Sequence, residues 1–275
     1  MDIAALFQQP NALPSAPKVV QELISSFNDE NVSADSIARK LAADPVLSVK
    51  LLRLANSAYY HLAHSVSTVN DAVMMLGFVT VRTLVISSGL VGGFKSTSGL
   101  DLDKFWRYSL NTAVAAKWLA LQADENPELA FTIGMTHAIG QLVIRTGMPE
   151  QALMLDKAAG FFDARRFDME HSSFGYNYAE VGAELASRWK FPIPFSNAIS
   201  AFPKPLEHQP FDPMAATIHL ASWMARANEN KLTPEEMRTS YPTDVAAKLG
   251  LDPYIMLDQM PPLAELSNGL EGLLS

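Results

Sequence analysis

The chain has 275 residues, of which 48% are hydrophobic and 18% charged, with a formal net charge of −8 and no cysteine. This composition excludes a disordered chain and allows one large domain or two small ones. The acidic charge, without a cluster of lysine and arginine, argues against nucleic acid as a partner, and the lack of cysteine excludes disulfides, thiolate metal ligands and a cysteine nucleophile.

Membrane and secretion signals are missing from the sequence. No apolar run reaches the roughly 20 residues that a helix needs to cross a bilayer. The longest candidate, VTVRTLVISSGLVGG (79–93), carries Arg82 and ends in glycines. The first residues, MDIAALFQQPNALP, lack the basic region and the apolar core of a signal peptide. We therefore expect a soluble cytoplasmic protein with no membrane partner.

Helix signals dominate along the chain. Four predicted helices begin with a capping residue followed by proline, at Asp44-Pro45, Asn126-Pro127, Asp212-Pro213 and Thr233-Pro234. Glu236 completes a capping box with Thr233. Apolar residues recur at helical spacing in three stripes: Leu47, Leu51 and Leu54; Leu110, Val114, Trp118 and Leu121; and Val181, Leu185 and Trp189. These patterns predict amphipathic helices.

Strand signals are weak, because alternation with a period of two residues is nearly absent and only TLVISSGLV (83–91) is ambiguous. We therefore predict an all-α fold. Loops are expected at 92–101, which is rich in glycine, serine and threonine, and at 202–213, which has four prolines. We divide the chain into an N-terminal helical part (1–99), a helical bundle (100–228) and a C-terminal helical extension (229–275).

The histidines are the first candidates for a metal site, because hydrolytic metal sites take histidine and carboxylate ligands from neighbouring helices. His61, His64 and His208 have no evident partner and are interpreted as ordinary residues near loops. His171 follows Asp168 and Glu170, but adjacent helical residues point to different faces. His219, between apolar residues, is predicted to be a core histidine.

His137 has a different context. The stretch MTHAIGQLVI (135–144) places it in a short turn between two apolar runs, with Gly134 and Gly140 allowing close approach of the backbone. Such a site could hold a metal ion. However, a lone imidazole without a carboxylate neither balances the charge of an ion nor orients a water molecule.

Four segments carry a resemblance that covers most of residues 13–225: LPSAPKVVQELISSFNDENVSADSIARKLAADPVLSVKLLRLANSAYY (13–60), VSTVNDAVMMLGFVTVRTLVIS (66–87), FWRYSLNTAVAAKWLA (105–120) with AFTIGMTHAIGQLVI (130–144), and YNYAEVGAELASRWKFP (176–192). They resemble the HDOD family, the HD-related output domains. The resemblance implies the fold of the HD metal phosphohydrolases and cyclic-di-GMP phosphodiesterases, a helical bundle packed on an N-terminal helical subdomain. It also implies that catalytic residues have been lost and that regulation proceeds through protein contacts.

The resemblance also implies a remnant pocket. His137 matches the histidine of the HD dipeptide, and Ala138 replaces the metal-binding aspartate. Tyr108, Tyr178 and Phe202 stand where histidines are common in active relatives. One histidine among such residues cannot hold divalent ions and activate water. We therefore predict no catalytic residue, no bound metal and no cofactor, and interpret His137 as a core histidine that is hydrogen-bonded to Tyr108 or Tyr178.

The function that the resemblance implies is that of a non-catalytic regulatory domain, and we expect it to bind a signalling protein in trans. Two alternatives remain open. The first is a metal-dependent phosphohydrolase acting on a nucleotide or cyclic dinucleotide, with ligands that converge on His137 from His171, Asp168, Asp163 and His219. The second is a sensor that binds a nucleotide without cleaving it, in a basic pocket built from Arg145, Arg165, Arg166 or Arg188; otherwise these arginines are expected on solvated helix faces.

Overall fold

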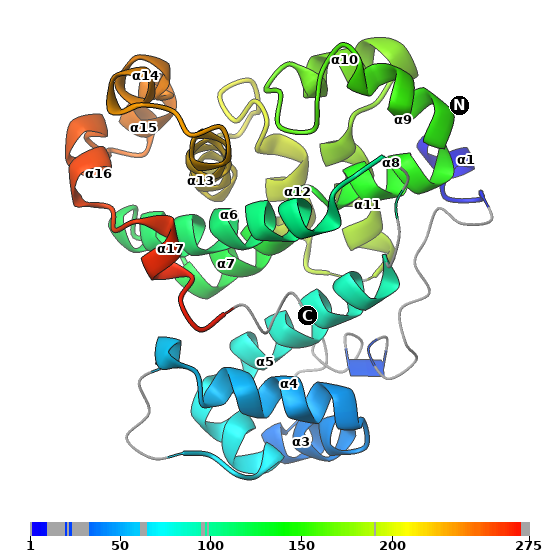
Figure 1. Ribbon diagram of the computed structural model, residues 1–275, viewed down its shortest axis with the longest axis vertical. Helices are drawn as coiled ribbons and strands as arrows, with labels where there is room; N and C mark the ends of the chain where they lie inside the picture. Colours follow the sequence, from blue (N-terminus) through cyan, green and yellow to red (C-terminus); the bar gives the residue numbers. More distant parts are fainter. Residues whose placement is uncertain are drawn as a thin grey trace. The chain divides into compact units, whose positions relative to one another are not determined.

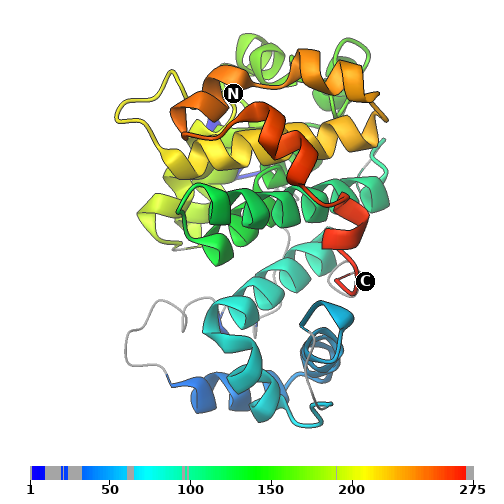
Figure 2. The ribbon, with the colours of Figure 1, turned by 90° about the vertical axis from the view of Figure 1, so that its left-hand side faces the viewer.

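The computed structural model of the chain describes residues 2–9, 20, 22–23, 33–60, 65–94, 97, 99–189 and 191–270. Within these residues every regular element is a helix, which confirms the predicted all-α fold (Figures 1 and 2). The ambiguous segment 83–91 lies in a helix. The residues fall into two compact units, a larger one (1–13, 96–188 and 192–263) and a smaller one (14–95, 189–191 and 264–275). The three-part division expected from the sequence stays a prediction.

In the smaller unit, helices α3 (Ala34–Ala42) and α4 (Pro45–Ala55) both pack against α5 (Val69–Gly93), and the short 3-10 helix η1 (Ala58–Tyr60) follows α4. As predicted, Asp44 caps α4 by accepting hydrogen bonds from the backbone N–H groups of Val46 and Leu47. The predicted stripe of Leu47, Leu51 and Leu54 is buried.

Helix α5 is bent at Gly77, where the backbone has a φ of 75° that favours glycine. The two parts of α5, 69–78 and 80–93, meet at 105°. No single helix in the described part of the chain is long and apolar enough to cross a bilayer, and the two parts of α5 reach that length only when they are counted together across the bend.

The larger unit contains most of the helices: α1 (Ile3–Leu6), α6 (Leu102–Gln122), α7 (Pro127–Thr136), α8 (Ile139–Gly147), α9 (Pro149–Asp156), α10 (Arg166–Phe174), α11 (Tyr178–Arg188), α12 (Ile193–Ala201), α13 (Pro213–Glu229), α14 (Pro234–Ser240), α15 (Thr243–Lys248) and α16 (Pro253–Gln259). Helix α17 (Leu263–Leu266) includes the boundary between the units. Helix α6 packs against α7 and α13, and α11 packs against α8 and α12 (Figure 1).

The other three predicted caps are also confirmed. Asn126 and Asp212 cap α7 and α13 with proline at the first helical position, and Thr233 forms a capping box with Glu236 at α14. These local signals place the helix starts correctly because a side-chain oxygen satisfies backbone N–H groups that have no partner inside the helix.

The stripe predicted on α6 is wrong at its end. Leu110 and Val114 are buried, but Leu121 is 61% exposed. Helix α6 packs against two neighbours, so its buried surface is wider than one stripe and includes several alanines instead of Leu121. On α11, Val181 and Leu185 are buried as predicted, and the helix ends at Arg188, before Trp189.

The predicted close approach at the two glycines beside His137 is confirmed. A Cβ atom on Gly140 would lie 1.9 Å from the carbonyl oxygen of Tyr178 and 2.7 Å from the nitrogen of Gly182. A Cβ atom on Gly134 would lie 2.7 Å from the Cα atom of Ala113. Helix α8 therefore touches α11 backbone to backbone, and α7 touches α6 in the same way, with His137 in the turn between α7 and α8.

Candidate functional site

A pocket of about 210 Å³ lies inside the larger unit, between residues of α6, α8, α10, α11 and α13 and the segments that precede α10 and follow α12. We call it the central pocket. Three predicted site residues line it, namely Tyr108, Tyr178 and Phe202. His137 and Ala138 are fully buried beside it, at 0% and 1% exposure. The structure thus brings together the residues that the sequence predicted as one site.

His137 is hydrogen-bonded, but not to a tyrosine. Its Nδ1 lies 2.6 Å from the carbonyl oxygen of Gly134, so this nitrogen carries the proton and donates it. The predicted partners are wrong: Tyr108 touches the imidazole only through its ring, at 5.0 Å between centroids, and Tyr178 makes no hydrogen bond to it. The helix turn itself offers a nearer acceptor. Burial lowers the pKa of His137 to about 3, so the ring is neutral.

Aromatic rings fill the space around His137. The ring of Phe202 lies 5.3 Å from the imidazole, and Phe161 and Phe162 lie 5.9 and 5.2 Å from Tyr108. Phe161 and Phe162 come from the segment between α9 and α10, and sequence reasoning missed them. Two adjacent phenylalanines after a glycine, at 160–162, were the available signal, since a solvated segment rarely needs both.

The alternative metal ligands do not converge. Asp163, Asp168 and His219 line the central pocket. Each carboxylate forms an ion pair with a nearby cation: Asp163 lies 2.6 Å from Arg165, and Asp168 lies 2.9 Å from Lys204.

His171 is exposed, with its Nδ1 3.7 Å from a carboxylate oxygen of Glu180, and His61 and His64 lie outside the described residues. Within the described residues, no group of three histidine or carboxylate side chains could hold one ion. The residues around His137 therefore do not fit a divalent metal, which needs several such ligands in reach of one point.

His219 and Arg226 form the polar wall of the central pocket. His219 donates from Nδ1 to the carbonyl oxygen of Phe202 at 2.9 Å, and burial lowers its pKa to about 4. The guanidinium of Arg226 lies 3.4 Å from the hydroxyl oxygen of Tyr108 and 3.3 Å from that of Ser222. His219 is hydrogen-bonded, as expected of a core histidine, but it also borders the cavity.

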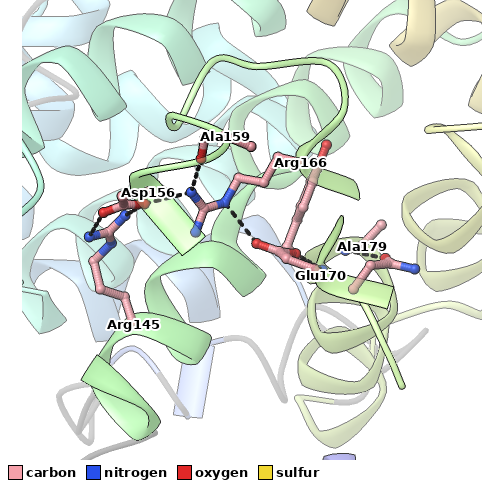
Figure 3. Close-up of polar contacts among 8 residues, drawn as sticks. Arg145, Asp156, Ala159, Arg166, Glu170 and Ala179 are labelled. Atoms are coloured by element: carbon pink, nitrogen blue, oxygen red, sulfur yellow. Dashed lines mark hydrogen bonds and ion pairs between the residues drawn. The ribbon is translucent and has the colours of Figure 1, made fainter. Parts of the chain in front are cut away.

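The arginines expected on solvated faces are in part buried, which corrects that expectation. Arg145 and Arg166 are each 2% exposed. Arg145 donates to both carboxylate oxygens of Asp156 at 2.7 and 2.8 Å, and Arg166 donates to Asp156 at 2.6 Å and to Glu170 at 2.8 Å (Figure 3). The two guanidinium groups can lie in the interior because these carboxylates balance their charge and accept their hydrogen bonds.

This buried ion network holds two walls of the central pocket. Glu170 accepts a hydrogen bond at 2.7 Å from the backbone N–H of Tyr178, the first residue of α11. Arg166 donates at 3.0 Å to the carbonyl oxygen of Ala159, just before the two phenylalanines (Figure 3). Burial raises the pKa of Glu170, whereas hydrogen bonds from Arg145 and Arg166 outweigh the effect of burial on Asp156 and lower its pKa.

None of the four arginines proposed for a basic pocket lines the central pocket. Arg165 and Arg188 are exposed and paired with Asp163 and Glu184. The cation at the wall is instead Arg226, which sequence reasoning missed. The sequence signal for this role was weak, because an arginine near the end of a helix is common whatever its function.

The two neutral histidines make stability depend on pH. Their folded pKa values of about 3 and about 4 lie below the ordinary 6.5, so the unfolded chain takes up protons first as the pH falls. The free energy of unfolding is therefore expected to fall below pH 6.5 by up to about 1.4 kcal/mol per pH unit for each histidine.

Urea unfolding of the wild type and of His137→Asn at pH 7 and pH 5.5 measures this dependence. Asparagine can still donate to the carbonyl oxygen of Gly134 but does not titrate, so His137→Asn is expected to remove about half of the histidine contribution. The exposed His171→Asn serves as the control. A His137→Asn variant with the wild-type pH dependence would contradict the assignment of a neutral, buried His137.

Comparison with known proteins places the chain in a family. The profile of the HDOD domain matches residues 13–205. An uncharacterized protein of Treponema pallidum (strain Nichols) is 24% identical over 241 residues, which make up 86% of this chain and 47% of that protein. The chain thus spans about half the length of this relative.

Three solved structures have the same fold as this chain. A Shewanella amazonensis SB2B protein, whose phosphohydrolase name is provisional, is 36% identical with a TM-score of 0.80, over 99% of this chain and 98% of that one. An HDOD domain protein of unknown function from Geobacter sulfurreducens is 23% identical with a TM-score of 0.72, over 98% and 95%. A Marinobacter aquaeolei VT8 protein, provisionally named for signal transduction, is 23% identical with a TM-score of 0.69, over 95% and 58%. The predicted resemblance is confirmed, and the chain belongs to the HDOD family.

Proposed function

We propose that the chain is a non-catalytic signalling domain that acts by binding another protein in trans. The observation that carries this proposal is the set of side chains that contact His137. The imidazole is neutral, fully buried and packed between the rings of Tyr108 and Phe202, with Ala138 beside it. A hydrolytic site would need a metal-bound water near this histidine, and the contacts of the imidazole are with aromatic rings rather than with carboxylates.

The smaller unit offers side chains suited to a protein contact. Val46 and Val49 on α4 are 64% and 50% exposed, and Met74 and Met75 on α5 are 67% and 55% exposed. Helices α4 and α5 pack against each other. Exposed apolar residues, methionine in particular, are typical of surfaces that bind other proteins. We propose this set, the four-residue apolar face, as the contact surface.

The names of the relatives favour two different functions. The signal transduction name of the Marinobacter protein agrees with the proposal, although this chain covers only 58% of that protein. The provisional phosphohydrolase name of the Shewanella protein favours a second candidate, hydrolysis of a phosphate ester. The ring contacts of His137 with Tyr108 and Phe202 support the first candidate over the second.

Capture with matched variants tests the proposed contact surface. The tagged wild type, Val49→Ser/Met74→Ser and the control Leu121→Ser/Met154→Ser are each used to capture and cross-link proteins from the native host. Both control residues are 61% exposed and lie in the larger unit. Exposed substitutions usually change stability by no more than about 0.5 kcal/mol, so all three proteins should be folded.

The expected result is a defined signalling protein that the wild type and the control retain and that Val49→Ser/Met74→Ser loses. Capture of nothing above background by the wild type would contradict the proposed function. Equal capture by the two variants would contradict the proposed surface.

A further inference from the structure

We infer that the central pocket binds a small organic anion made of one flat ring, an anionic group and N–H or O–H donors. This inference does not rest on the proposed protein partner. It follows from three properties of the pocket, which are an unbalanced positive charge, a buried polar group without a partner, and aromatic walls around a small volume.

The unbalanced charge is that of Arg226. Its two contacts, to the hydroxyl oxygens of Tyr108 and Ser222, are long and involve neutral groups. The carboxylates at the pocket, Asp163 and Asp168, are each paired with another cation. Throughout the described ranges, no carboxylate lies within ion-pair distance of Arg226. A guanidinium at a cavity wall without a counter-ion favours an anion, which it can bind through two parallel hydrogen bonds.

The polar group without a partner belongs to Gln141. Gln141 is 5% exposed and lines the pocket, and its side-chain oxygen is buried without a hydrogen bond. Tyr178 lines the same pocket. A buried polar group that lacks a hydrogen bond destabilises the fold, so its presence in a cavity wall points to a ligand that supplies the missing partner.

Hydrogen-bond acceptors in the pocket wall indicate that the ligand carries N–H or O–H donors. His219 donates from Nδ1 to a carbonyl oxygen, so its other nitrogen is an acceptor. The amide oxygen of Gln141 is a second acceptor in the same wall. A ligand with N–H or O–H groups could donate to these acceptors, which an anionic group alone cannot do.

The aromatic walls and the volume of the pocket indicate that the ligand has one flat ring. Rings of Phe161, Phe167 and Phe202 line the pocket together with the two tyrosines. Aromatic walls favour a flat ring, which can pack edge to face against them. The volume of about 210 Å³ is below the range of roughly 300–1,000 Å³ that is usual for drug-sized ligands. The pocket therefore fits a single ring with its substituents.

Calorimetric titration with simple probes tests the inference. We choose 4-aminophenyl phosphate and 4-aminobenzoate, which carry ring, anion and donor, together with aniline, which lacks the anion, and inorganic phosphate, which lacks the ring and the amino group. At least one of the first two is expected to bind about tenfold or more tightly than either of the others, the magnitude of one charged hydrogen bond. The ratio between the first two tells a phosphate ligand from a carboxylate ligand.

Two variants assign the binding to this pocket. Arg226→Gln is expected to weaken binding about tenfold or more, because it removes the cation. The control Arg39→Gln changes the net charge equally, at a side chain of the smaller unit that is 71% exposed and pairs with Asp35, and is expected to bind as the wild type does. Gln141→Met keeps the size of the side chain and removes the unpaired amide, so it is expected to weaken binding while the melting temperature stays the same or rises.

The inference is overturned if the wild type binds neither ring-containing anion at millimolar concentration. It is also overturned if Arg226→Gln binds as tightly as the wild type, or if Gln141→Met lowers the melting temperature and leaves binding unchanged. Failure to find a protein partner would leave these results unaffected, because the probes act on the isolated chain.

Discussion

Replacing Arg166 with methionine is expected to lower the free energy of unfolding by about 3–5 kcal/mol, the usual cost of breaking a buried ion pair by removing one partner. Arg166 is 2% exposed and joins Asp156 to Glu170 through hydrogen bonds of 2.6 and 2.8 Å. Methionine would fill much of the space but leave the fully buried Glu170 without its cation. Urea unfolding of the wild type and the variant at pH 7 measures the difference.

The neighbouring residue provides a matched control. Arg165→Met removes the same charge one position earlier, from a side chain that is 72% exposed and pairs with Asp163. Exposed ion pairs contribute about 0–1 kcal/mol, so this control is expected to change stability little. A loss of less than about 1 kcal/mol in Arg166→Met, or equal losses in both variants, would contradict the stabilising role given to the network.

Replacing Gly140 with alanine is expected to lower the free energy of unfolding by about 3 kcal/mol or more, the upper end of the usual cost of overpacking. The new Cβ atom would lie 1.9 Å from the carbonyl oxygen of Tyr178 and 2.7 Å from the nitrogen of Gly182. Both are backbone atoms, so no side chain can rotate away, and α8 and α11 must separate. The same movement would displace Tyr178 at the central pocket.

Thermal and urea unfolding of Gly140→Ala compared with Gly160→Ala measures this effect. A Cβ atom on Gly160 would meet nothing within 4 Å. The control is therefore expected to be neutral or slightly stabilising, because alanine reduces the freedom of the unfolded chain. A Gly140→Ala variant as stable as the wild type would show that α8 and α11 are not in direct backbone contact.

Sequence patterns predicted the parts of the fold that local physics determines. The four capping residues act on N–H groups two or three positions away, so a short stretch contains all the information. The glycines beside His137 were recognised for the same reason, since close packing of helices requires the smallest residue. The gathering of Tyr108, Tyr178 and Phe202 around His137 came from the family resemblance and not from spacing.

The parts that the sequence did not predict depend on partners distant in the chain. Arg145 and Arg166 look like surface residues until Asp156 and Glu170 fold against them. Arg226 lies 118 positions from its contact Tyr108. Side chains of this kind have the same local pattern whether buried or exposed, and only the tertiary fold decides between the two.

The metal content of tag-free protein purified without chelator tests the central claim most directly, with His137→Asn as the matched variant. If the chain is a non-catalytic HDOD domain, elemental analysis should find well below one transition-metal ion per chain, with no difference between the two proteins. One or two ions per chain in the wild type, lost in His137→Asn, would show that His137 is a ligand and would contradict the non-catalytic assignment.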